Sequence, residues 1–406
     1  MIKIFTAITF TCLLHLNGMA QTWTLQNQFQ NIEPGDMHFI DDNNGFIIAD
    51  STQNGNFITT VCIATQNGGQ SWSHYPLNNA NGNIFKCYFL NANEGFIAGR
   101  GAGGNSGVFM KTTDGGSTWS SPVLFNERIN NVFFMNASTG WVMGKNGFLQ
   151  KTIDGGVTWS AQSITNEDGF SMRFYNSTTG LFACGGGELY LTSDGGMSWQ
   201  MVTSGTGDNL MSITISGNDA WICGEGGAVV YSNTAGQTWV AQTANTSVDF
   251  NDVAFVSATE GWLVGLSGEM KYTSDGGTTW VSQTSSSGAD ILAIEMRNSG
   301  LGWFLDSDGD LYKYSTPAGI EDVKNVVAVN VYPNPIEDEI HILKSDVNWS
   351  KAVLMDATGK VLYTSALQKN GRNQSLYISN LQLTPGIYLL RLENANLTGV
   401  QTLIKK

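Results

Sequence analysis

Apolar and polar residues alternate along most of the chain in short runs, and clusters of Gly, Asn and Asp separate these runs. One stretch shows the pattern clearly, with NNVFFMN at 130–136, GWVMG at 140–144 and FLQKT at 148–152. Alternation with a period of two is typical of strands that bury one face, and the residues between the runs favour turns. The pattern predicts an all-β protein built from short hairpins.

The runs belong to a repeated unit. An octapeptide of the form Ser/Thr-x-Asp-x-Gly-x-Thr/Ser-Trp recurs at a spacing that settles to 40 or 41 residues, and two weaker copies have Asn67 and Thr234 in place of the Asp. The tryptophans of the six copies are Trp72, Trp119, Trp159, Trp199, Trp239 and Trp280. A second landmark precedes each octapeptide: a small residue, then an aromatic residue or Leu, then apolar residues. It starts at positions 45, 95, 140, 180, 220, 261 and 302. Four short strands at this period predict a seven-bladed β-propeller.

Seven landmarks face only six octapeptides, and the stretch AQTWTLQNQ at 20–28 accounts for the difference. Trp23 precedes Gly45 by 22 residues, the spacing that also separates Trp239 from Gly261. The seventh landmark opens GWFLDSDGDLYKYST at 302–316, which has no octapeptide after it. We therefore predict that residues 22–27 pair with residues 310–316 and close the ring as the outer strand of the last blade.

The start of the chain indicates where the protein acts, and its composition indicates which fold and which partners suit it. Lys3, the apolar run 4–16 and the small residues Gly18 and Ala20 predict a secretory signal peptide over residues 1–20, followed by a mature chain without a transmembrane segment. With 48 glycines and 13% charged residues the chain suits a turn-rich β-protein, and its formal charge of −14 disfavours nucleic acid as a partner. The four later cysteines match no zinc-binding pattern, and they could be either buried free thiols or members of disulfides. They are Cys62, Cys87, Cys184 and Cys223.

The octapeptide is the Asp box, and residues 21–316 resemble the Asp-box (BNR) repeat propellers, especially those typified by photosystem II assembly factors. The resemblance implies the propeller fold, but such propellers include sialidases, xyloglucan hydrolases, sorting receptors and non-catalytic assembly factors. Within the box, Asp can accept backbone N–H groups of the turn, and Trp can pack between blades. We therefore assign a structural role to the box tryptophans and to Asp114, Asp154, Asp194 and Asp275.

Ligand-binding residues are expected where the repeats differ. Extra residues at 49–56 and 99–107 predict two long loops beside the central opening, and the shorter loops of other blades would lie near them. Arg173 and Glu295 fall on inner strands of different blades and could form a charged pair near the axis. The full set of candidates is Asp50, Asn54, Arg100, Asn105, Lys145, Arg173, Glu225, Glu295 and Asp306.

A row of carboxylates recurs just before four inner strands, at Asp168, Asp208, Asp249 and Asp290. They could bind a cation, or they could cap the turns through local hydrogen bonds, which is the favoured interpretation. No cofactor is expected.

Catalysis is disfavoured for this propeller. A sialidase needs an arginine cluster, and before residue 317 the chain offers only Arg100, Arg128, Arg173 and Arg297, without an Arg-Ile-Pro signature. In the xyloglucan hydrolases the catalytic cleft lies between two propellers, and the sequence of this chain predicts a single propeller. We expect a non-catalytic module that binds a protein or a glycan, with a sialidase-like or xyloglucanase-like glycoside hydrolase as the alternative.

The pattern changes after a polar linker at 317–328. Residues 329–406 resemble the type A C-terminal sorting domain of the type IX secretion system of Bacteroidetes, through YPNP at 332–335, Gly359-Lys360, PGIY at 385–388 and the basic end Lys405-Lys406. Several short alternating strands independently predict a small β-sandwich. The resemblance implies the secretion machinery as a partner and a secreted or surface-attached product, which we expect to be monomeric.

Overall fold

The computed structural model describes residues 22–54, 56–77, 82–101 and 104–315. Beyond them it describes 326–329, 331–336, 339–342, 349–356, 361–367, 374–378, 381, 383–394 and 398–405. The predicted signal peptide, Gly359-Lys360 and most of the predicted linker lie outside these residues. Contacts divide the chain into two compact units, one of which spans Trp23–Tyr314.

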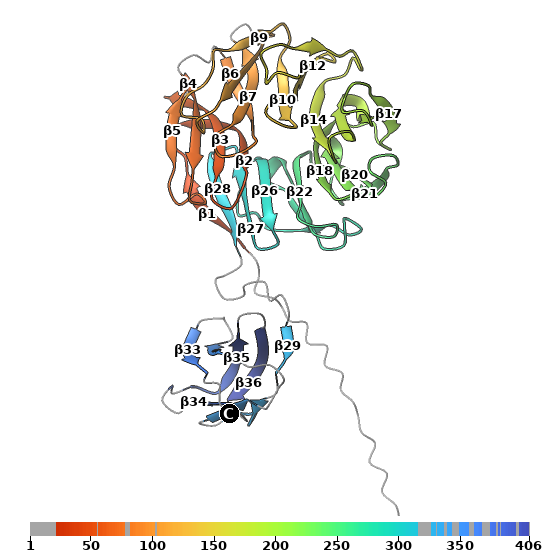
Figure 1. Ribbon diagram of the computed structural model, residues 1–406. Coiled ribbons are helices and arrows are strands. Elements are labelled where there is room, and N and C mark those ends of the chain that lie inside the picture. Colours follow the sequence, from red (N-terminus) through yellow and green to blue (C-terminus); the bar gives the residue numbers. More distant parts are fainter. Residues whose placement is uncertain are drawn as a thin grey trace, which may run out of the picture. The chain divides into compact units, whose positions relative to one another are not determined.

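Seven four-stranded antiparallel sheets can be counted in the described part of this first unit. Figure 1 shows them arranged in a ring, in chain order from β2 onward. Their strands are β2 (Ile32–Phe39), β3 (Gly45–Gln53), β4 (Asn56–Thr65) and β5 (Ser73–Pro76) in the first sheet; β6 (Gly82–Phe89), β7 (Gly95–Gly101), β8 (Gly107–Thr112) and β9 (Val123–Phe125) in the second; β10 (Ile129–Phe134), β11 (Gly140–Gly144), β12 (Leu149–Thr152) and β13 (Ser160–Ala161) in the third.

The remaining four sheets repeat this arrangement. In the fourth, fifth and sixth sheets a short 3-10 turn joins the second and third strands: η1 (Gly185–Gly187), η2 (Glu225–Gly227) and η3 (Leu266–Gly268). Their strands are β14 (Gly169–Phe174), β15 (Gly180–Cys184), β16 (Glu188–Thr192) and β17 (Gln200–Thr203) in the fourth; β18 (Leu210–Ser216), β19 (Asp219–Gly224), β20 (Ala228–Ser232) and β21 (Val240–Thr243) in the fifth; β22 (Phe250–Phe255), β23 (Gly261–Gly265), β24 (Met270–Thr273) and β25 (Val281–Ser282) in the sixth; β26 (Ile291–Asn298), β27 (Leu301–Asp306), β28 (Asp310–Ser315) and β1 (Thr22–Gln28) in the seventh.

The N-terminal strand closes the ring. β1 is hydrogen-bonded beside β28, as the count of landmarks predicts. Trp23 is buried and packs against the rings of Phe304 and Tyr314, with centroids 4.9 Å and 4.8 Å away. The inner strands contact one another around the axis, and β26 contacts β2 in the same way. Closure removes the strand edges that an open seventh sheet would expose.

The small residue of the landmark has a steric cause. In five sheets it is a glycine that faces the phenyl ring of the last inner-strand residue, and a Cβ there would lie 2.3–2.6 Å from that ring. The ring in turn stacks on the landmark aromatic of the preceding sheet, with centroids 3.5–5.0 Å apart. The five pairs are Phe39 with Gly45, Phe89 with Gly95, Phe134 with Gly140, Phe174 with Gly180 and Phe255 with Gly261. The landmark residues therefore form the packing contact between neighbouring sheets, which we call the seam.

The first predicted long loop is strand for most of its length, and the second is strand at its two ends. Residues 49–53 continue β3 and 56 onward already belong to β4, while β7 and β8 extend to Gly101 and from Gly107. The physical reason is that both insertions lengthen a hairpin symmetrically, so the added residues keep pairing across it.

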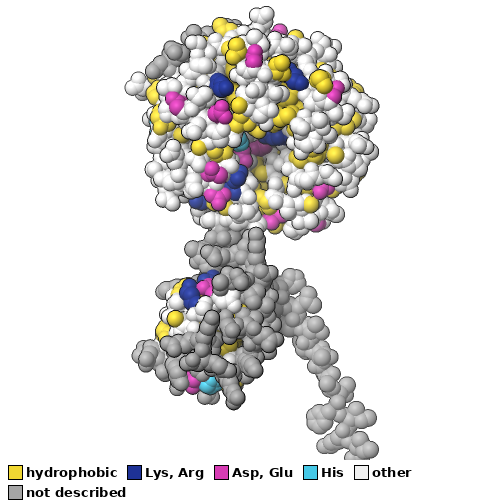
Figure 2. Space-filling view, viewed as in Figure 1, with side chains coloured by type: hydrophobic (Ala, Val, Ile, Leu, Met, Phe, Trp, Pro, Cys, Tyr) yellow, Lys and Arg dark blue, Asp and Glu magenta, His cyan; other side chains and the backbone are white. Residues whose placement is uncertain are grey.

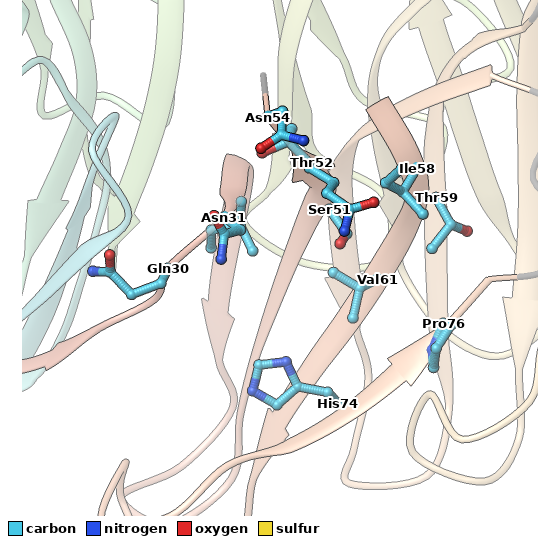
Figure 3. Close-up of a pocket in the computed structure, with 12 residues that line it drawn as sticks. Gln30, Asn31, Ser51, Thr52, Asn54, Ile58, Thr59, Val61, His74 and Pro76 are labelled. Carbon is cyan, nitrogen blue, oxygen red and sulfur yellow. The ribbon is translucent and has the colours of Figure 1, made fainter. Parts of the chain in front are cut away.

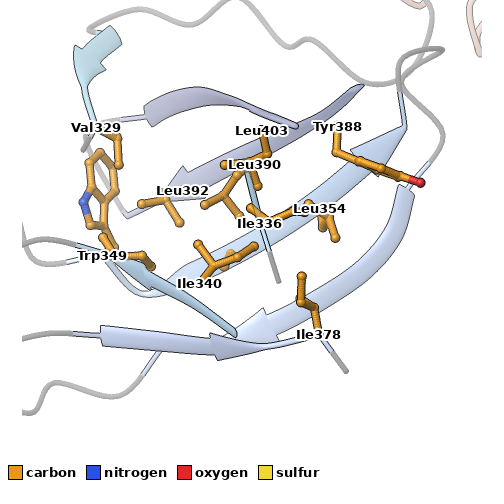
Figure 4. Packing of buried hydrophobic residues seen from close by; sticks show 12 residues of the cluster. Val329, Ile336, Ile340, Trp349, Leu354, Ile378, Tyr388, Leu390, Leu392 and Leu403 are labelled. Atoms are coloured by element: carbon orange, nitrogen blue, oxygen red, sulfur yellow. The ribbon is translucent and has the colours of Figure 1, made fainter. Parts of the chain in front are cut away.

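The C-terminal unit contains a five-stranded and a three-stranded sheet among its described residues. The strands are β29 (Val326–Ala328), β30 (Val331–Tyr332), β31 (Glu339–Ile342), β32 (Lys351–Asp356), β33 (Val361–Ala366), β34 (Gln374–Tyr377), β35 (Gly386–Glu393) and β36 (Thr398–Lys405). Both sheets contribute to one apolar core, in which Trp349, Leu354 and Leu390 are buried together with Ile340 (Figure 4). Within the described part of the chain, no helix has the length and hydrophobicity needed to cross a bilayer.

Candidate functional site

A β-bulge occurs at the same place in every inner strand of the ring. The pairing with the second strand skips one residue, and these bulged residues are Gly35, Phe85, Asn130, Phe170, Met211, Asn251 and Leu292. A bulge leaves the extra residue unpaired and changes the direction of its side chain. Seven bulges at one level therefore bring six side chains to the axis that a regular ladder would not, since the seventh bulged residue is a glycine.

The bulged residues line one end of the central channel, which we call the mouth. Its cavity of about 240 Å³ is bordered by four large apolar side chains, those of Phe85, Phe170, Met211 and Leu292. Arg128 joins them, with its guanidinium 4.9 Å from the centre of the Phe85 ring. Lys86 and three asparagine side chains also line it, so the mouth combines an apolar collar with two cations and amide groups.

One residue further along each inner strand lies a level that we call the polar ring. It holds six polar residues and one alanine: Asp36, Lys86, Asn131, Ser171, Ser212, Asp252 and Ala293. Several of its members satisfy the exposed backbone edge of the next inner strand. Asp36 accepts the N–H of Cys87 at 3.1 Å, and Ser171 accepts that of Ile213 at 3.2 Å. An inner strand has no sheet neighbour on its axial side, so these side chains supply the partners that its backbone needs.

The two carboxylates of this polar ring, Asp36 and Asp252, already accept hydrogen bonds from neighbouring inner strands. Asp252 accepts the Ser212 hydroxyl at 2.6 Å and the Ile294 N–H at 2.9 Å. Burial raises the pKa of Asp252, and these hydrogen bonds and the charge of Lys86 oppose the rise. Asp36 lies 3.4 Å from the Lys86 ammonium. Both carboxylates therefore hold the inner strands together.

A second polar level contains His38, Tyr88, Arg173 and Glu295. His38 Nδ1 accepts the Phe89 N–H at 2.9 Å, and its ring stacks on Tyr88 with centroids 5.1 Å apart. Burial, with Arg173 and Arg297 adding to it, lowers the pKa of His38 to about 3. The ring is therefore neutral at neutral pH, and its proton resides on Nε2, because Nδ1 is already an acceptor.

Glu295 faces His38, with Oε1 3.9 Å from Nε2. Burial, reinforced by the charge of Asp252, raises the pKa of Glu295 to about 8, against the opposing effect of Arg173. The carboxyl is thus largely protonated at neutral pH. Among the described residues, the Arg173 guanidinium hydrogen-bonds to one acceptor, the Met172 carbonyl at 3.0 Å. Figure 2 shows basic, acidic and histidine side chains together in the hollow at the centre of the propeller.

Of the predicted ligand-binding residues, the structure brings Arg173 and Glu295 into this one cavity. Asp50 and Asp306 are buried, and their carboxylates accept hydrogen bonds within the fold, from Thr60 and Asn83 for the first and from Ser287 for the second. Burial raises the pKa of both. The other candidates are exposed on separate turns and strand ends, at Asn54, Arg100, Asn105, Lys145 and Glu225.

Asn54 lines a different cavity, of about 550 Å³, beside the first sheet (Figure 3). The turn Gln30–Asn31 forms one wall, the tip of the β3–β4 hairpin forms another, and Val61 and His74 lie at its base. Its lining is made of amide, hydroxyl and aliphatic side chains and one imidazole, without an acidic or basic chain among the described residues. Among the described lining residues, none is a Trp, Tyr or Phe of the kind that stacks on sugars.

The row of carboxylates proposed for a cation caps turns. Asp168, Asp249 and Asp290 each accept the N–H of a turn residue in the preceding sheet, at 2.7–2.9 Å. In the remaining sheet Asn209 makes this contact with Gly186, while Asp208 bonds to Thr206. Among the described residues, no three His, Cys, Asp or Glu side chains are grouped so that they could hold a metal ion.

The Asp boxes are closed by local hydrogen bonds. In the box of β8, Asp114 accepts the Thr118 N–H at 2.8 Å and the Thr118 hydroxyl at 2.6 Å, and the same contacts recur at Asp154, Asp194 and Asp275. These hydrogen bonds lower the pKa of Asp154 to about 2.

The four described cysteines are buried free thiols.

The channel residues that the sequence-based candidates missed include four ionisable ones: Asp36, His38, Lys86 and Asp252. A signal for part of this set was available, because Asp36, Lys86 and Asp252 each stand nine residues before a landmark glycine. That count identifies the level after the bulge, although the bulge itself is not evident from alternation alone.

Comparison with known protein families gives two matches. The family of the photosystem II assembly factor YCF48 matches residues 17–129, 122–202 and 240–315, which together exceed half of the chain. The chain belongs to this family. Its YCF48-type repeats are followed by a secretion-system C-terminal sorting domain over residues 330–406. The sorting domain indicates export to the surface or the medium and implies the type IX machinery as a partner.

Solved structures agree on the fold. A structure entitled "YCF48 bound to D1 peptide" is 21% identical with a TM-score of 0.57, over 73% of this chain and 95% of that one. YCF48 from Cyanidioschyzon merolae gives 19% identity and 0.57, over 72% and 98%. PorZ, a surface component of the type IX secretion system of Porphyromonas gingivalis, gives 13% and 0.55, over 91% of this chain and 59% of its own. No curated protein sequence matches the chain.

Proposed function

We propose that this YCF48-family propeller is a non-catalytic binding module that acts at the cell surface or outside the cell, and that its ligand is an extended segment of another protein. The observation that carries the proposal is the mouth of the channel. Its four apolar side chains and Arg128 form a concave collar on the axis, which suits apolar and acidic side chains of a peptide.

The chemistry of the channel supports a binding role over a hydrolytic one. A glycosidase needs two carboxyl groups free to act as acid and as nucleophile or base. Asp36 and Asp252 already accept backbone N–H groups, which leaves Glu295 as the carboxyl without such a contact among the described channel residues. The solved YCF48 structure with a bound peptide adds a precedent for peptide binding by this fold.

The test is a selection of extended peptides on the purified full-length exported protein, followed by affinity measurements on variants. Replacing Phe170 and Met211 by Ala should weaken the selected peptides at least about tenfold, because it removes half of the collar. Leu124→Ala is the matched control, since this side chain is 64% exposed and lies outside the mouth. Equal binding by all variants would exclude the mouth as the site.

The same preparation should be assayed for release of reducing sugars from glycans. We expect none. Turnover that Glu295→Gln abolishes would instead establish the glycoside hydrolase alternative.

A further inference from the structure

The second polar level of the channel contains hydrogen-bond donors that converge without an acceptor to share. His38 presents its Nε2 proton, and the protonated Glu295 carboxyl lies 3.9 Å away, which is too far for a hydrogen bond between them. Arg173 lines the same cavity, and among the described residues its guanidinium donates to one acceptor, the carbonyl of its neighbour Met172. Three donors that line one small cavity can together bind a ligand that only accepts hydrogen bonds.

We propose that His38, Arg173 and Glu295 form a binding site for a small carboxylate anion such as acetate. A guanidinium can donate two parallel N–H bonds to the two oxygens of a carboxylate, and an imidazole N–H or a carboxylic acid can donate a further one. This site does not depend on whether the mouth takes a peptide.

The size of the cavity limits the ligand. At this level it measures about 60 Å³. A water molecule needs about 10–15 Å³ on such a measure, so an ion of a few heavy atoms fits and a sugar ring does not.

The charges around the site favour one negative ion. Lys86 and Tyr88 of β6, Arg173 of β14, Asp36 and His38 of β2, and Asp252 of β22 face Glu295, and Arg297 follows it on β26. Cys87 of β6 also lines the cavity, as a neutral thiol whose pKa burial raises well above its ordinary value. Arg297 is already paired with Asp42, at 3.9 Å, and Lys86 with Asp36, at 3.4 Å. Asp252 is held by its hydrogen bonds to Ser212 and Ile294. Among the described residues, Arg173 is therefore the cation of this level that makes no ion pair with a carboxylate, and a bound monoanion would pair with it, whereas ionised Glu295 would compete for it.

Isothermal titration calorimetry of the full-length exported protein with sodium acetate at pH 6.5 tests the site. Ionic strength is held with sodium gluconate, a carboxylate too large for the cavity. Arg173→Gln should weaken acetate at least about tenfold. Lys111→Gln, with the same change of charge, should alter it less than about twofold, because Lys111 lies over Phe96 and outside the channel lining.

The pH dependence separates this site from general charge attraction. Raising the pH to 9 should weaken acetate binding by wild-type protein about tenfold, because Glu295 loses its proton, while Glu295→Gln should change less than about twofold. Arg173→Lys covers the case in which Arg173→Gln does not fold. It keeps the charge and loses the paired donors, so it too should weaken acetate.

Three results would overturn the proposal: acetate binding that folded Arg173 variants retain, a pH dependence that persists in Glu295→Gln, or equal binding of gluconate. Tighter binding of chloride than of acetate would make this a halide site and would also exclude the carboxylate assignment.

Discussion

Gly140→Ala tests whether the seam between neighbouring sheets is as tight as its geometry indicates. A Cβ on Gly140 would lie 2.5 Å from the Phe134 ring, and that ring cannot retreat because Phe96 stacks on it at 3.5 Å. Overpacking of this kind costs about 1–3 kcal/mol, and the lower entropy of the unfolded Ala chain returns about 0.5–1 kcal/mol. We expect a net loss of about 1–2 kcal/mol in the free energy of unfolding, measured by urea denaturation.

The fifth sheet supplies the control. There Ala220 replaces the glycine and faces Ile215 in place of a phenylalanine. Phe134→Ile should therefore rescue Gly140→Ala, with a coupling energy of at least about 1 kcal/mol in a double-mutant cycle. A coupling near zero, or a Gly140→Ala protein as stable as wild type, would refute the steric explanation of the landmark.

Three further outcomes are expected. Trp23→Ala should lower the free energy of unfolding by about 3–5 kcal/mol in denaturation experiments, while Leu25→Ala, 48% exposed on the same strand, should change it by less than about 0.5 kcal/mol. The raised pKa of Glu295, about 8 in the fold against 4.5 as its ordinary value, means that stability present at low pH is lost as the pH rises toward 8. Between pH 6.5 and 8, wild type should lose up to about 1.4 kcal/mol per pH unit relative to Glu295→Gln, a comparison in which the titration of His38 is common to both proteins, and parallel pH profiles would contradict the raised pKa. Asp114→Asn should be nearly neutral and Asp114→Ala should cost about 1–2 kcal/mol on thermal or urea unfolding, because Asn67 makes the equivalent contact to the Ser71 N–H at 2.9 Å; equal losses would show that charge is essential there.

The repeat made most of the fold predictable. The spacing of Trp23 from Gly45 identified the closing strand, because a repeat fixes register over the whole ring. Periodicity also placed Asp208 in the row of turn caps, where the structure uses Asn209. Asp208 has the same spacing along the chain as the other three carboxylates. The β18–β19 hairpin is one residue shorter, however, so Asn209 occupies the capping position there.

The site was harder to predict because it depends on two things that one sequence does not display. Arg173 and Glu295 were expected near the axis, since inner strands face it. His38 and Lys86 were not, because a bulge shifts the alternation that would identify axial side chains. Their partners also come from other sheets, at separations that only the closed ring brings together.

Closure by the first strand has a consequence for the order of folding. The side chain of Gln28 bonds to Asp310 across 282 residues of sequence, so the strand made first is the last that can be placed. Pairing between segments so far apart in the sequence is slow, because the entropy of closing the loop is lost before β1 and β28 make contact. Until then β1 and β28 both expose a free edge. An exported chain of this design is most vulnerable to misassembly and proteolysis in the interval between arrival of its two ends.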